Sequence, residues 1–445
     1  MNPRILIVGG GFGGLDAART LGGAPVRVTL LDRHNHHVFQ PLLYQVATAS
    51  LSPGDIASPI RWILRRQKNI EVLLANVRSI DPANKRVLIE GDDEIAYDYL
   101  IVATGAAHSY FGHDEWAARA PGLKTLDDAL VMRRRMLLAF EAAEREADPA
   151  KQKRLLTFVI IGGGPTGVEL AGALAEIARQ SLRQDFRRIH PESARIVLLE
   201  GSPHVLGNFH DPLREAARRA LERLGVEVCT GSIVTQVDAD GVLWRPATRP
   251  GSGQADSSSR PPSGGPDGSE RISAETVLWA AGVAASPIAK SLGVPLDRVG
   301  RVPVDATLTV PGHPEIFVAG DICALQQDGA WLPGVAQVAM QEGAHAARNI
   351  LRAIGGRPLE PFRYRDYGIM ATIGRGSAVG EIFGLKISGF FAWLFWIFLH
   401  IFWLIGFRNR FVVMTEWAWA YITAQRRVRL ITGDKSDSPG VTRSR

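Results

Sequence analysis

The sequence predicts an α/β protein with two similar halves, followed by a helical region at the C-terminal end. Three observations support this prediction. Two glycine-rich stretches, IVGGGFGGLDAA at 7–18 and IIGGGPTGVELAG at 160–172, each follow a short β-branched run and open a helix. A similar apolar strand comes later in each half, in YDYLIVATGA at 97–106 and AETVLWAAGV at 274–283. Residues 390–407 are then almost wholly apolar.

The first glycine-rich stretch has the spacing of a dinucleotide-binding turn. The run at 4–8 predicts a buried parallel strand, and Gly9, Gly11 and Gly14 then turn the chain into a helix. The first glycine permits the tight turn, the second lets a pyrophosphate approach the backbone, and the third packs helix on strand. The next strand, VRVTLLD, ends at Asp32, where a carboxylate can accept hydrogen bonds from ribose hydroxyls.

The second stretch repeats this pattern with Gly162, Gly164 and Gly167. Its next strand, ARIVLLE, ends at Glu200, 38 residues after Gly162, so we expect an extended helix and loop between them. A carboxylate at the end of this strand would repel a 2′-phosphate, which favours NADH over NADPH.

Two dinucleotide sites in one chain indicate FAD paired with NADH, because a flavin can take a hydride on one side and pass electrons onward. A third fragment, HPEIFVAGDICA at 313–324, has a strand that ends at Gly320–Asp321 and supports the flavin site. We therefore predict two Rossmann-like dinucleotide-binding domains and a C-terminal helical membrane-anchoring region.

The predicted domains follow from the positions of these motifs along 445 residues. A discontinuous FAD-binding domain takes 1–115 and 285–365, an NADH-binding domain takes 116–284, and the anchoring region takes 366–445. Pro, Gly and Ser dominate 246–270, which predicts a disordered surface loop within the second domain.

Cysteine usage favours a reducing compartment. The chain has two cysteines, Cys229 and Cys323, and no CxxC motif for dithiol chemistry. The first predicted strand begins at Arg4, so we expect no secretory or transit segment before it.

The C-terminal region has the composition of a membrane anchor. The apolar segment at 390–407 has eighteen residues, near the lower limit of the roughly 20 that a spanning helix needs. The stretch FVVMTEWAWAYITAQRRVRL mixes aromatic and basic residues, with Arg426, Arg427 and Arg429 at its end. Residues 408–445 hold eight Lys/Arg and three Asp/Glu, which suits an anionic lipid surface and argues against nucleic acid. The alternative is an apolar interface between two copies of the chain.

A glutamine pair is the candidate site for a lipid-soluble electron acceptor. In VAQVAMQEGAHAARNI, Gln337 and Gln341 lie four residues apart and share a helix face. Their amides could hydrogen-bond the carbonyls of a quinone, and the small alanines would let a ring lie close. The alternative is a polar stripe on an ordinary helix.

The chain resembles the type II NADH:quinone oxidoreductases, the single-subunit, non-proton-pumping NADH dehydrogenases, almost from end to end. The resemblance covers both glycine motifs and FQPLLYQVATASLSPGDIASPIR, VLWAAGV, VAGD, AQVAMQEG and LIGFRNR. It implies that electrons pass from NADH through FAD to a membrane quinone. It also implies FAD contacts from Gly9, Gly11, Gly14, Asp32, Thr104, Gly105 and Asp321. NADH contacts are implied for Gly164, Thr166, Gly167, Glu169, Glu200 and Gly282. The resemblance also implies catalytic roles for Glu169, near the nicotinamide and flavin, and for Gln337 and Gln341, at the quinone head group.

The same resemblance implies a monotopic protein on the cytoplasmic face of a bacterial inner membrane, with paired helices of a homodimer dipping into one leaflet. No calcium-binding loop is present, so we expect no metal. Three alternatives stay open. A sulfide:quinone oxidoreductase would need redox cysteines, and only Cys323 lies near the expected flavin site. A soluble ferredoxin or rubredoxin reductase would lack the apolar tail, and a non-catalytic membrane redox sensor could keep both nucleotide sites.

Overall fold

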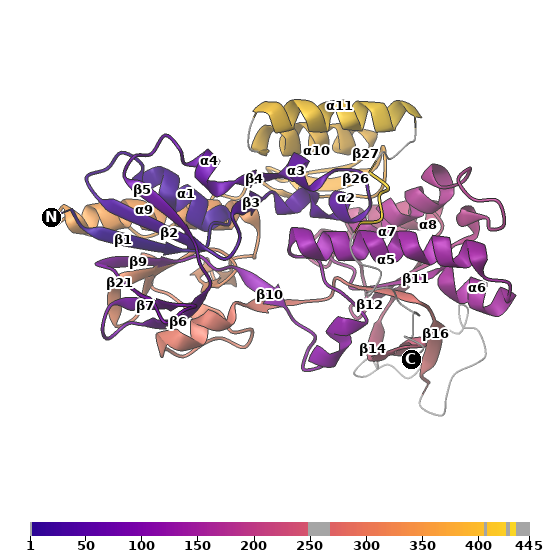
Figure 1. Ribbon diagram of the computed structural model, residues 1–445, viewed down its shortest axis with the longest axis horizontal. Helices are drawn as coiled ribbons and strands as arrows, with labels where there is room; N and C mark the ends of the chain where they lie inside the picture. Colours follow the sequence, from indigo (N-terminus) through magenta and orange to yellow (C-terminus); the bar gives the residue numbers. More distant parts are fainter. Residues whose placement is uncertain (1, 248–267, 405–406, 424–427, 433–445) are drawn as a thin grey trace. The chain divides into compact units, whose positions relative to one another are not determined.

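The computed structural model describes residues 2–247, 268–404, 407–423 and 428–432 (Figure 1). The chain divides into two compact units, each built from three segments. Unit 1 consists of Met1–Val38, Ala57–His108 and Val283–Tyr367. Unit 2 consists of Phe39–Ile56, Ser109–Gly282 and Gly368–Arg445. Most of the loop predicted at 246–270 lies outside the described residues.

Unit 1 is built on a six-stranded sheet in the order β20-β21-β9-β1-β2-β5. The strands are β1 (Arg4–Val8), β2 (Arg27–Asp32), β5 (Ile70–Leu74), β9 (Tyr99–Val102), β20 (Thr309–Val310) and β21 (His313–Val318). All neighbours run parallel except β20 and β21. The β-branched run of β1 is buried from Ile5 to Val8, as expected of a central parallel strand.

Two helices of unit 1, α1 (Phe12–Leu21) and α9 (Ala336–Ile354), pack against each other (Figure 1). They approach so closely that a Cβ on Gly343 would lie 1.9 Å from the carbonyl oxygen of Gly13. Smaller elements of the unit include β3 (His36–Val38) with β4 (Ala57–Pro59), β6 (Val77–Asp81) with β7 (Arg86–Ile89) and β8 (Glu94–Ala96), and β10 (Ala106–His108) with β18 (Val283–Ala285).

Unit 2 repeats this topology. Its parallel sheet has the order β13-β12-β11-β17, which matches β5-β2-β1-β9 strand for strand. The strands are β11 (Thr157–Ile161), β12 (Arg195–Glu200), β13 (Val226–Thr230) and β17 (Thr276–Trp279). In unit 1 the antiparallel sheet of β6, β7 and β8 comes just before β9. In the same way, an antiparallel sheet of β14 (Ser232–Asp238), β15 (Gly241–Pro246) and β16 (Glu270–Ser273) comes just before β17. The predicted α/β fold with two similar halves is therefore confirmed.

The helices of unit 2 include α2 (Leu43–Ala47), α5 (Leu126–Arg145), α6 (Pro149–Leu155), α7 (Pro165–Glu176) and α8 (Asp211–Arg223). A capping box of Thr125 and Asp128 begins α5. The long gap before Glu200 is filled by α7, a π-helical turn at Ile177–Ser181 and a loop. That loop is held by Glu144 of α5, whose carboxylate accepts hydrogen bonds from successive backbone N–H groups at 187–189.

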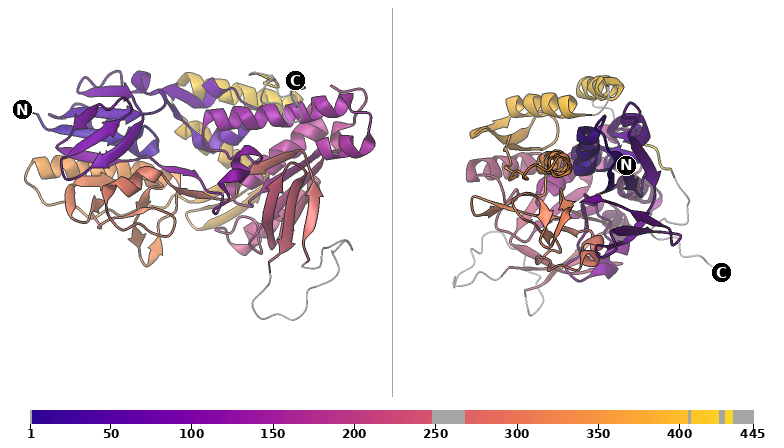
Figure 2. Two further views of the ribbon diagram at one scale, coloured as in Figure 1. Left: turned by 60° about the horizontal axis from the view of Figure 1, so that its bottom comes forward. Right: turned by 90° about the vertical axis from the view of Figure 1, so that its left-hand side faces the viewer.

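The C-terminal part of unit 2 begins with an antiparallel sheet of β25 (Ile369–Thr372), β26 (Ala378–Ile382) and β27 (Leu385–Gly389). Two helices follow and lie side by side, α10 (Phe390–Trp403) and α11 (Phe407–Thr423) (Figures 1 and 2). The apolar segment predicted at 390–407 is therefore interrupted, because Leu404 is extended, with ψ 133°. Among the described helices, none combines the length and the hydropathy that a bilayer crossing requires.

Half of the residues of α10 are exposed although the helix is apolar. Phe391 and Phe398 are 81% and 66% exposed, whereas Ala392 and Trp396 are buried. Arg429 donates to the Ser181 carbonyl and pairs with Asp185. Arg426 and Arg427, predicted to end the second helix, lie outside the described residues.

Candidate functional site

The turn between β1 and α1 contains three glycines of the motif. The fold requires glycine at two of these positions, and at the third it does not. Gly9 has φ +104°, and a Cβ there would lie 2.3 Å from the Ala103 carbonyl oxygen. A Cβ on Gly14 would lie 1.7 Å from the carbonyl oxygen of Gly9. At Gly11, in contrast, a Cβ would meet no atom within 4 Å. The open space over Gly11 is what a bound pyrophosphate would fill.

Asp32 is anchored against this turn. Its Oδ2 accepts from the Gly10 N–H at 2.6 Å, and its Oδ1 accepts from the His34 N–H at 2.7 Å. Each carboxylate oxygen keeps a second lone pair, which a ribose hydroxyl can use. The carboxylate therefore stands where the sequence places a ribose contact.

His37 is a buried neighbour of this site. It is 2% exposed, its Nδ1 lies 3.1 Å from the Gly10 carbonyl oxygen, and its Nε2 has no hydrogen-bond partner. Burial lowers the pKa of His37 to about 4, so the ring is neutral. Because a carbonyl only accepts, Nδ1 holds the proton and Nε2 is an acceptor. The only sequence signal was its place in the short run HHV after the acidic strand end.

Of the other flavin candidates of unit 1, Asp321 lines a cavity. About 530 Å³ of empty space, partly open to solvent, lies between Ala106, Asp321 and Gly334, among other residues. The hydroxyl of Thr104 is buried without a hydrogen-bond partner, and Gly105 has φ +67°. An open glycine cradle, an unpartnered hydroxyl and a cavity at Asp321 fit a bound FAD.

A buried carboxyl holds the loop at Asp321 in place. Glu342 of α9 accepts from the Gly320 N–H at 2.6 Å and from the Cys323 thiol. Burial raises the pKa of Glu342 to about 8 and raises that of the Cys323 thiol well above its usual value. Cys323 is therefore a poor source of thiolate.

The second glycine turn copies the first in detail. A Cβ on Gly162 would lie 2.5 Å from the Ala280 carbonyl carbon, and a Cβ on Gly167 would lie 1.8 Å from the Gly162 oxygen. A Cβ on Gly164 would again meet nothing within 4 Å. Glu200 repeats the role of Asp32: it accepts from the Gly163 N–H at 2.5 Å and from the Ser202 N–H at 2.7 Å. We call this arrangement of two fixed glycines, an open middle glycine and an acidic strand end the glycine cradle. Unit 2 thus has a second one.

Three further candidates of unit 2 lie around this cradle. Thr166 and Glu169 are on the first turns of α7, and Gly282 follows β17. A Cβ on Gly282 would lie 2.7 Å from the Phe111 ring. Glu169 is partly exposed, and its Oε1 is 3.5 Å from the Thr372 N–H. Loss of solvation raises its pKa to about 8, so this carboxyl is protonated near neutral pH.

Gln337 and Gln341 share a face of α9, and both amides meet the segment 364–367. Gln341 donates to the Arg365 carbonyl at 2.9 Å and accepts from the Arg365 N–H at 3.0 Å. The carbonyl of Gln337 accepts from the Tyr364 hydroxyl at 3.5 Å and from the Tyr367 N–H at 3.4 Å. The sequence pattern placed the two amides together but did not reveal these backbone partners.

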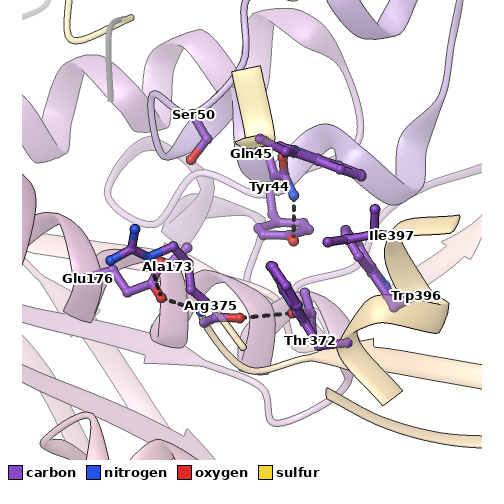
Figure 3. A pocket seen from close by; sticks show the side chains of 12 residues that line it. Tyr44, Gln45, Ser50, Ala173, Glu176, Thr372, Arg375, Trp396 and Ile397 are labelled. Carbon is purple, nitrogen blue, oxygen red and sulfur yellow. Dashed lines mark hydrogen bonds and ion pairs between the residues drawn. The ribbon is translucent and has the colours of Figure 1, made fainter. Parts of the chain in front are cut away.

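A pocket in unit 2 was not predicted from the sequence (Figure 3). It holds about 630 Å³ of empty space, partly open to solvent, and we call it the tryptophan pocket. Its lining residues are Tyr44, Gln45, Ser50, Ala173, Glu176, Thr372, Gly374, Arg375, Trp393, Trp396, Ile397 and Trp417. Helices α10 and α11 contribute its tryptophans and Ile397, and its polar side chains include Gln45, Ser50, Glu176, Thr372 and Arg375.

Hydrogen bonds and an ion pair join lining residues of this pocket in two groups. The Trp417 indole N–H donates to Gln45 Oε1 at 2.7 Å, and Gln45 Nε2 donates to the Tyr44 hydroxyl at 2.9 Å. The Arg375 backbone N–H donates to the Glu176 carboxylate, which also pairs with the Arg375 guanidinium at 4.0 Å.

His400 packs beside this pocket. It stacks on Trp396 with ring centroids 4.1 Å apart, and its Nδ1 bonds the Trp396 carbonyl oxygen. Burial lowers the pKa of His400 to about 4, so it is a neutral packing group. Over the described part of the chain, no cluster of three or more His, Cys, Asp or Glu side chains could hold a metal ion.

Comparison with known proteins gives one family and several relatives. Residues 3–343 match the pyridine nucleotide-disulphide oxidoreductase family. The chain is 43% identical over 444 residues to type II NADH:quinone oxidoreductase Ndh of Mycobacterium tuberculosis, covering 97% of this chain and 91% of that protein.

Two solved structures share the fold. The structure of NDH2 from Plasmodium falciparum in complex with NADH has a TM-score of 0.84 at 19% identity, covering 97% of this chain and 100% of its own. The sulfide:quinone oxidoreductase of Aquifex aeolicus has a TM-score of 0.71 at 18% identity, covering 92% of each chain.

Proposed function

We propose a function from one premise: this chain belongs to the type II NADH:quinone oxidoreductases, within the pyridine nucleotide-disulphide oxidoreductase family. It is a flavoenzyme that passes electrons from NADH through FAD to a quinone, without pumping protons. When bound, FAD takes a hydride equivalent from NADH and gives two electrons to the quinone. The protein contributes binding, orientation and control of protons.

The observation that supports this function best is the duplicated cradle. In both units the outer glycines are fixed by backbone contact, the middle glycine is open, and an acidic side chain ends the second strand. We assign the FAD site to unit 1, with Gly9, Gly11, Gly14, Asp32, Thr104, Gly105 and Asp321 as its contacts. We assign the NADH site to unit 2, with Gly164, Thr166, Gly167, Glu169, Glu200 and Gly282 as its contacts.

The side-chain chemistry of Glu169, Gln337 and Gln341 supports a role for each in the reaction. The protonated carboxyl of Glu169 can donate a hydrogen bond to the nicotinamide or hold a proton close to it. Gln337 and Gln341 form the quinone head-group site in this proposal. Because the Gln341 amide both donates to and accepts from the Arg365 backbone, a quinone carbonyl must either accept from the second N–H of Gln341 Nε2 or displace that backbone contact.

The exposed aromatic faces of α10 and α11 support a membrane role. Phe391, Phe398, Phe411 and Trp419 are all large, apolar and exposed. A patch of this kind on a protein that serves a lipid-soluble acceptor suits insertion into one leaflet. We propose a monotopic homodimer on the cytoplasmic face of a bacterial inner membrane, with 366–445 as its anchoring region.

One assay tests this function against its alternatives. Purified protein reconstituted on vesicles that contain quinone would be supplied with NADH, NADPH or sulfide in turn. We expect quinone reduction with NADH and much slower reduction with NADPH. Turnover with sulfide would instead indicate a sulfide:quinone oxidoreductase, and no turnover with any donor would indicate a redox sensor. The high pKa of the Cys323 thiol argues against the sulfide reaction.

A further inference from the structure

The peptide group between Gly10 and Gly11 is held at its carbonyl end by the side chain of His37. The imidazole donates from Nδ1 to the Gly10 carbonyl oxygen at 3.1 Å, since a carbonyl can only accept. The ring lies edge-on to Phe12, with ring centroids 4.9 Å apart. The backbone of His37 is also fixed, because this residue lies opposite Ser58 in the pairing of β3 with β4. The donor for this carbonyl therefore has a defined place.

Holding the Gly10 carbonyl also sets the direction of the next N–H group. A trans peptide group is planar, and its C=O and N–H bonds point in opposite directions. Because the Gly10 carbonyl points to His37, the Gly11 N–H points away from it. Gly11 is the N-cap of α1, where backbone N–H groups lack partners within the helix. This N–H is therefore one of the donors that a pyrophosphate at the turn would meet.

The glycine cradle of unit 2 is held in the same way, but with a backbone donor. The Gly163 N–H donates to Glu200 at 2.5 Å. In unit 1 the Gly10 N–H donates to Asp32 at 2.6 Å. The Gly163 carbonyl accepts from the Leu206 N–H at 2.7 Å. Each cradle thus has a carboxylate on the N–H and a donor on the carbonyl of the same glycine, and only in unit 1 is that donor a side chain.

The second ring nitrogen of His37 has no comparable role. His37 is 2% exposed, and its Nε2 has no hydrogen-bond partner among the described residues. Burying an unpaired polar atom costs free energy. An apolar side chain would fill this space without that cost, so the bond from Nδ1 to the Gly10 carbonyl is what an imidazole adds here.

We propose that His37 is a positioning residue for FAD, because its Nδ1–H holds the Gly10 carbonyl and so aims the Gly11 N–H at the pyrophosphate. His37 acts through the peptide group between the two glycines and not by contact with the cofactor. This inference rests on the proposed function, which assigns the FAD site to unit 1, and adds to that site a residue that acts through the backbone.

His37→Asn and His37→Leu form a matched pair that tests this role. Both side chains have the same branched shape and leave the same space, but only the amide can donate from the position of Nδ1. We expect the rate of FAD release from the purified holoenzyme to rise about tenfold or more in His37→Leu, because a buried carbonyl loses its donor. In His37→Asn the rate should stay within about threefold of the unaltered rate. Return of flavin fluorescence after dilution measures both rates.

A phosphorus-31 spectrum of the bound FAD separates positioning from a general loss of stability. The pyrophosphate signals should shift in His37→Leu and keep their positions in His37→Asn. His36→Leu is the matched control, because His36 is the neighbour on β3 and its ring bonds the Asn35 side chain. Its FAD release should equal that of the unaltered protein. NADH affinity should be unchanged in all variants, because Leu206 holds the second cradle.

An unchanged rate of FAD release in His37→Leu would overturn the inference. Release from His37→Asn as fast as from His37→Leu, or unshifted phosphate signals in His37→Leu, would do the same. Should His37→Leu fail to fold, His37→Gln replaces it, because the longer side chain carries its amide beyond the position of Nδ1, and FAD release should again be faster. Absence of quinone reduction by FAD-loaded, unaltered protein would instead overturn the proposed function.

Discussion

Gln341 and Arg365 are joined by a reciprocal pair of hydrogen bonds, in which the glutamine amide mimics a strand neighbour for the Arg365 backbone. Gln337, one turn earlier on α9, makes weaker contacts at 3.4 and 3.5 Å. We therefore expect Gln341 to contribute more to the stability of the protein than Gln337.

Replacing each glutamine with leucine should separate its effect on protein stability from its effect on quinone reduction. We expect Gln337→Leu to slow quinone turnover about tenfold or more with little change in thermal stability. Gln341→Leu should also destabilise the protein by about 1–3 kcal/mol, because it leaves the Arg365 backbone groups unpaired. Calorimetry and stopped-flow reduction of the flavin by NADH would measure the two effects. Equal loss of flavin reduction in both variants would contradict a quinone role.

Gly11→Val should expel FAD while the fold survives. A Cβ at this position would meet no protein atom within 4 Å, so we expect the conflict to be with the bound pyrophosphate. The visible flavin spectrum should disappear while the far-ultraviolet circular dichroism stays native. Gly14→Val is the contrasting variant, because its side chain would collide with the Gly9 carbonyl and disturb the fold itself. Normal flavin content in Gly11→Val would remove Gly11 from the site.

Glu200→Gln should narrow the preference for NADH over NADPH about tenfold, which corresponds to roughly 1.4 kcal/mol of lost discrimination. The variant keeps an oxygen that can accept from the Gly163 N–H, so the turn should stay intact. The ratio of kcat/KM for the two donors measures the effect, and flavin content serves as the control. Equal use of both donors by the unaltered protein would contradict the assignment of Glu200.

The raised pKa of Glu169 predicts a pH dependence of stability. Its folded-state pKa of about 8 lies above the ordinary value of 4.5, so folding favours the protonated form. The stability that this provides is complete below pH 4.5 and is lost as pH rises through about 8. The Tm of Glu169→Gln should therefore fall less between pH 5 and pH 9 than the Tm of the unaltered protein. Parallel Tm profiles would show that Glu169 is ionised in the folded protein.

Removing the exposed helices should detach the protein from lipid. A chain that ends after Gly389 keeps β27 paired with β26, so no strand edge is newly exposed. We expect a soluble protein that retains FAD and oxidises NADH with a water-soluble acceptor but reduces long-chain quinone poorly. Co-sedimentation with anionic vesicles and paired activity assays would measure this. Undiminished vesicle binding by the shortened chain would place the lipid contact elsewhere.

The glycine turns and acidic strand ends were predictable because their function depends on spacing within one short segment. The tryptophan pocket was not, since Trp417 is separated from Tyr44 and Gln45 by most of the chain and meets them only through tertiary packing. The apolar run at 390–407 was predicted to be continuous, although Gly406 near its end was an available signal for a break. The burial of His37 could not be predicted, because nothing local distinguishes a buried imidazole from a surface one.

The close contact of Gly13 with Gly343 has a consequence for synthesis on the ribosome. Helix α1 emerges early, but its neighbour α9 and the strand β21 are made only after the whole parallel sheet of unit 2. At about 5–20 residues per second, α1 waits on the order of 15–60 s for its neighbour. Unit 2 can therefore assemble its central sheet while the first Rossmann-like half is still incomplete. In a nascent chain stalled near residue 330, the strands β11, β12, β13 and β17 should accordingly be protected from protease while 4–32 is still cleaved.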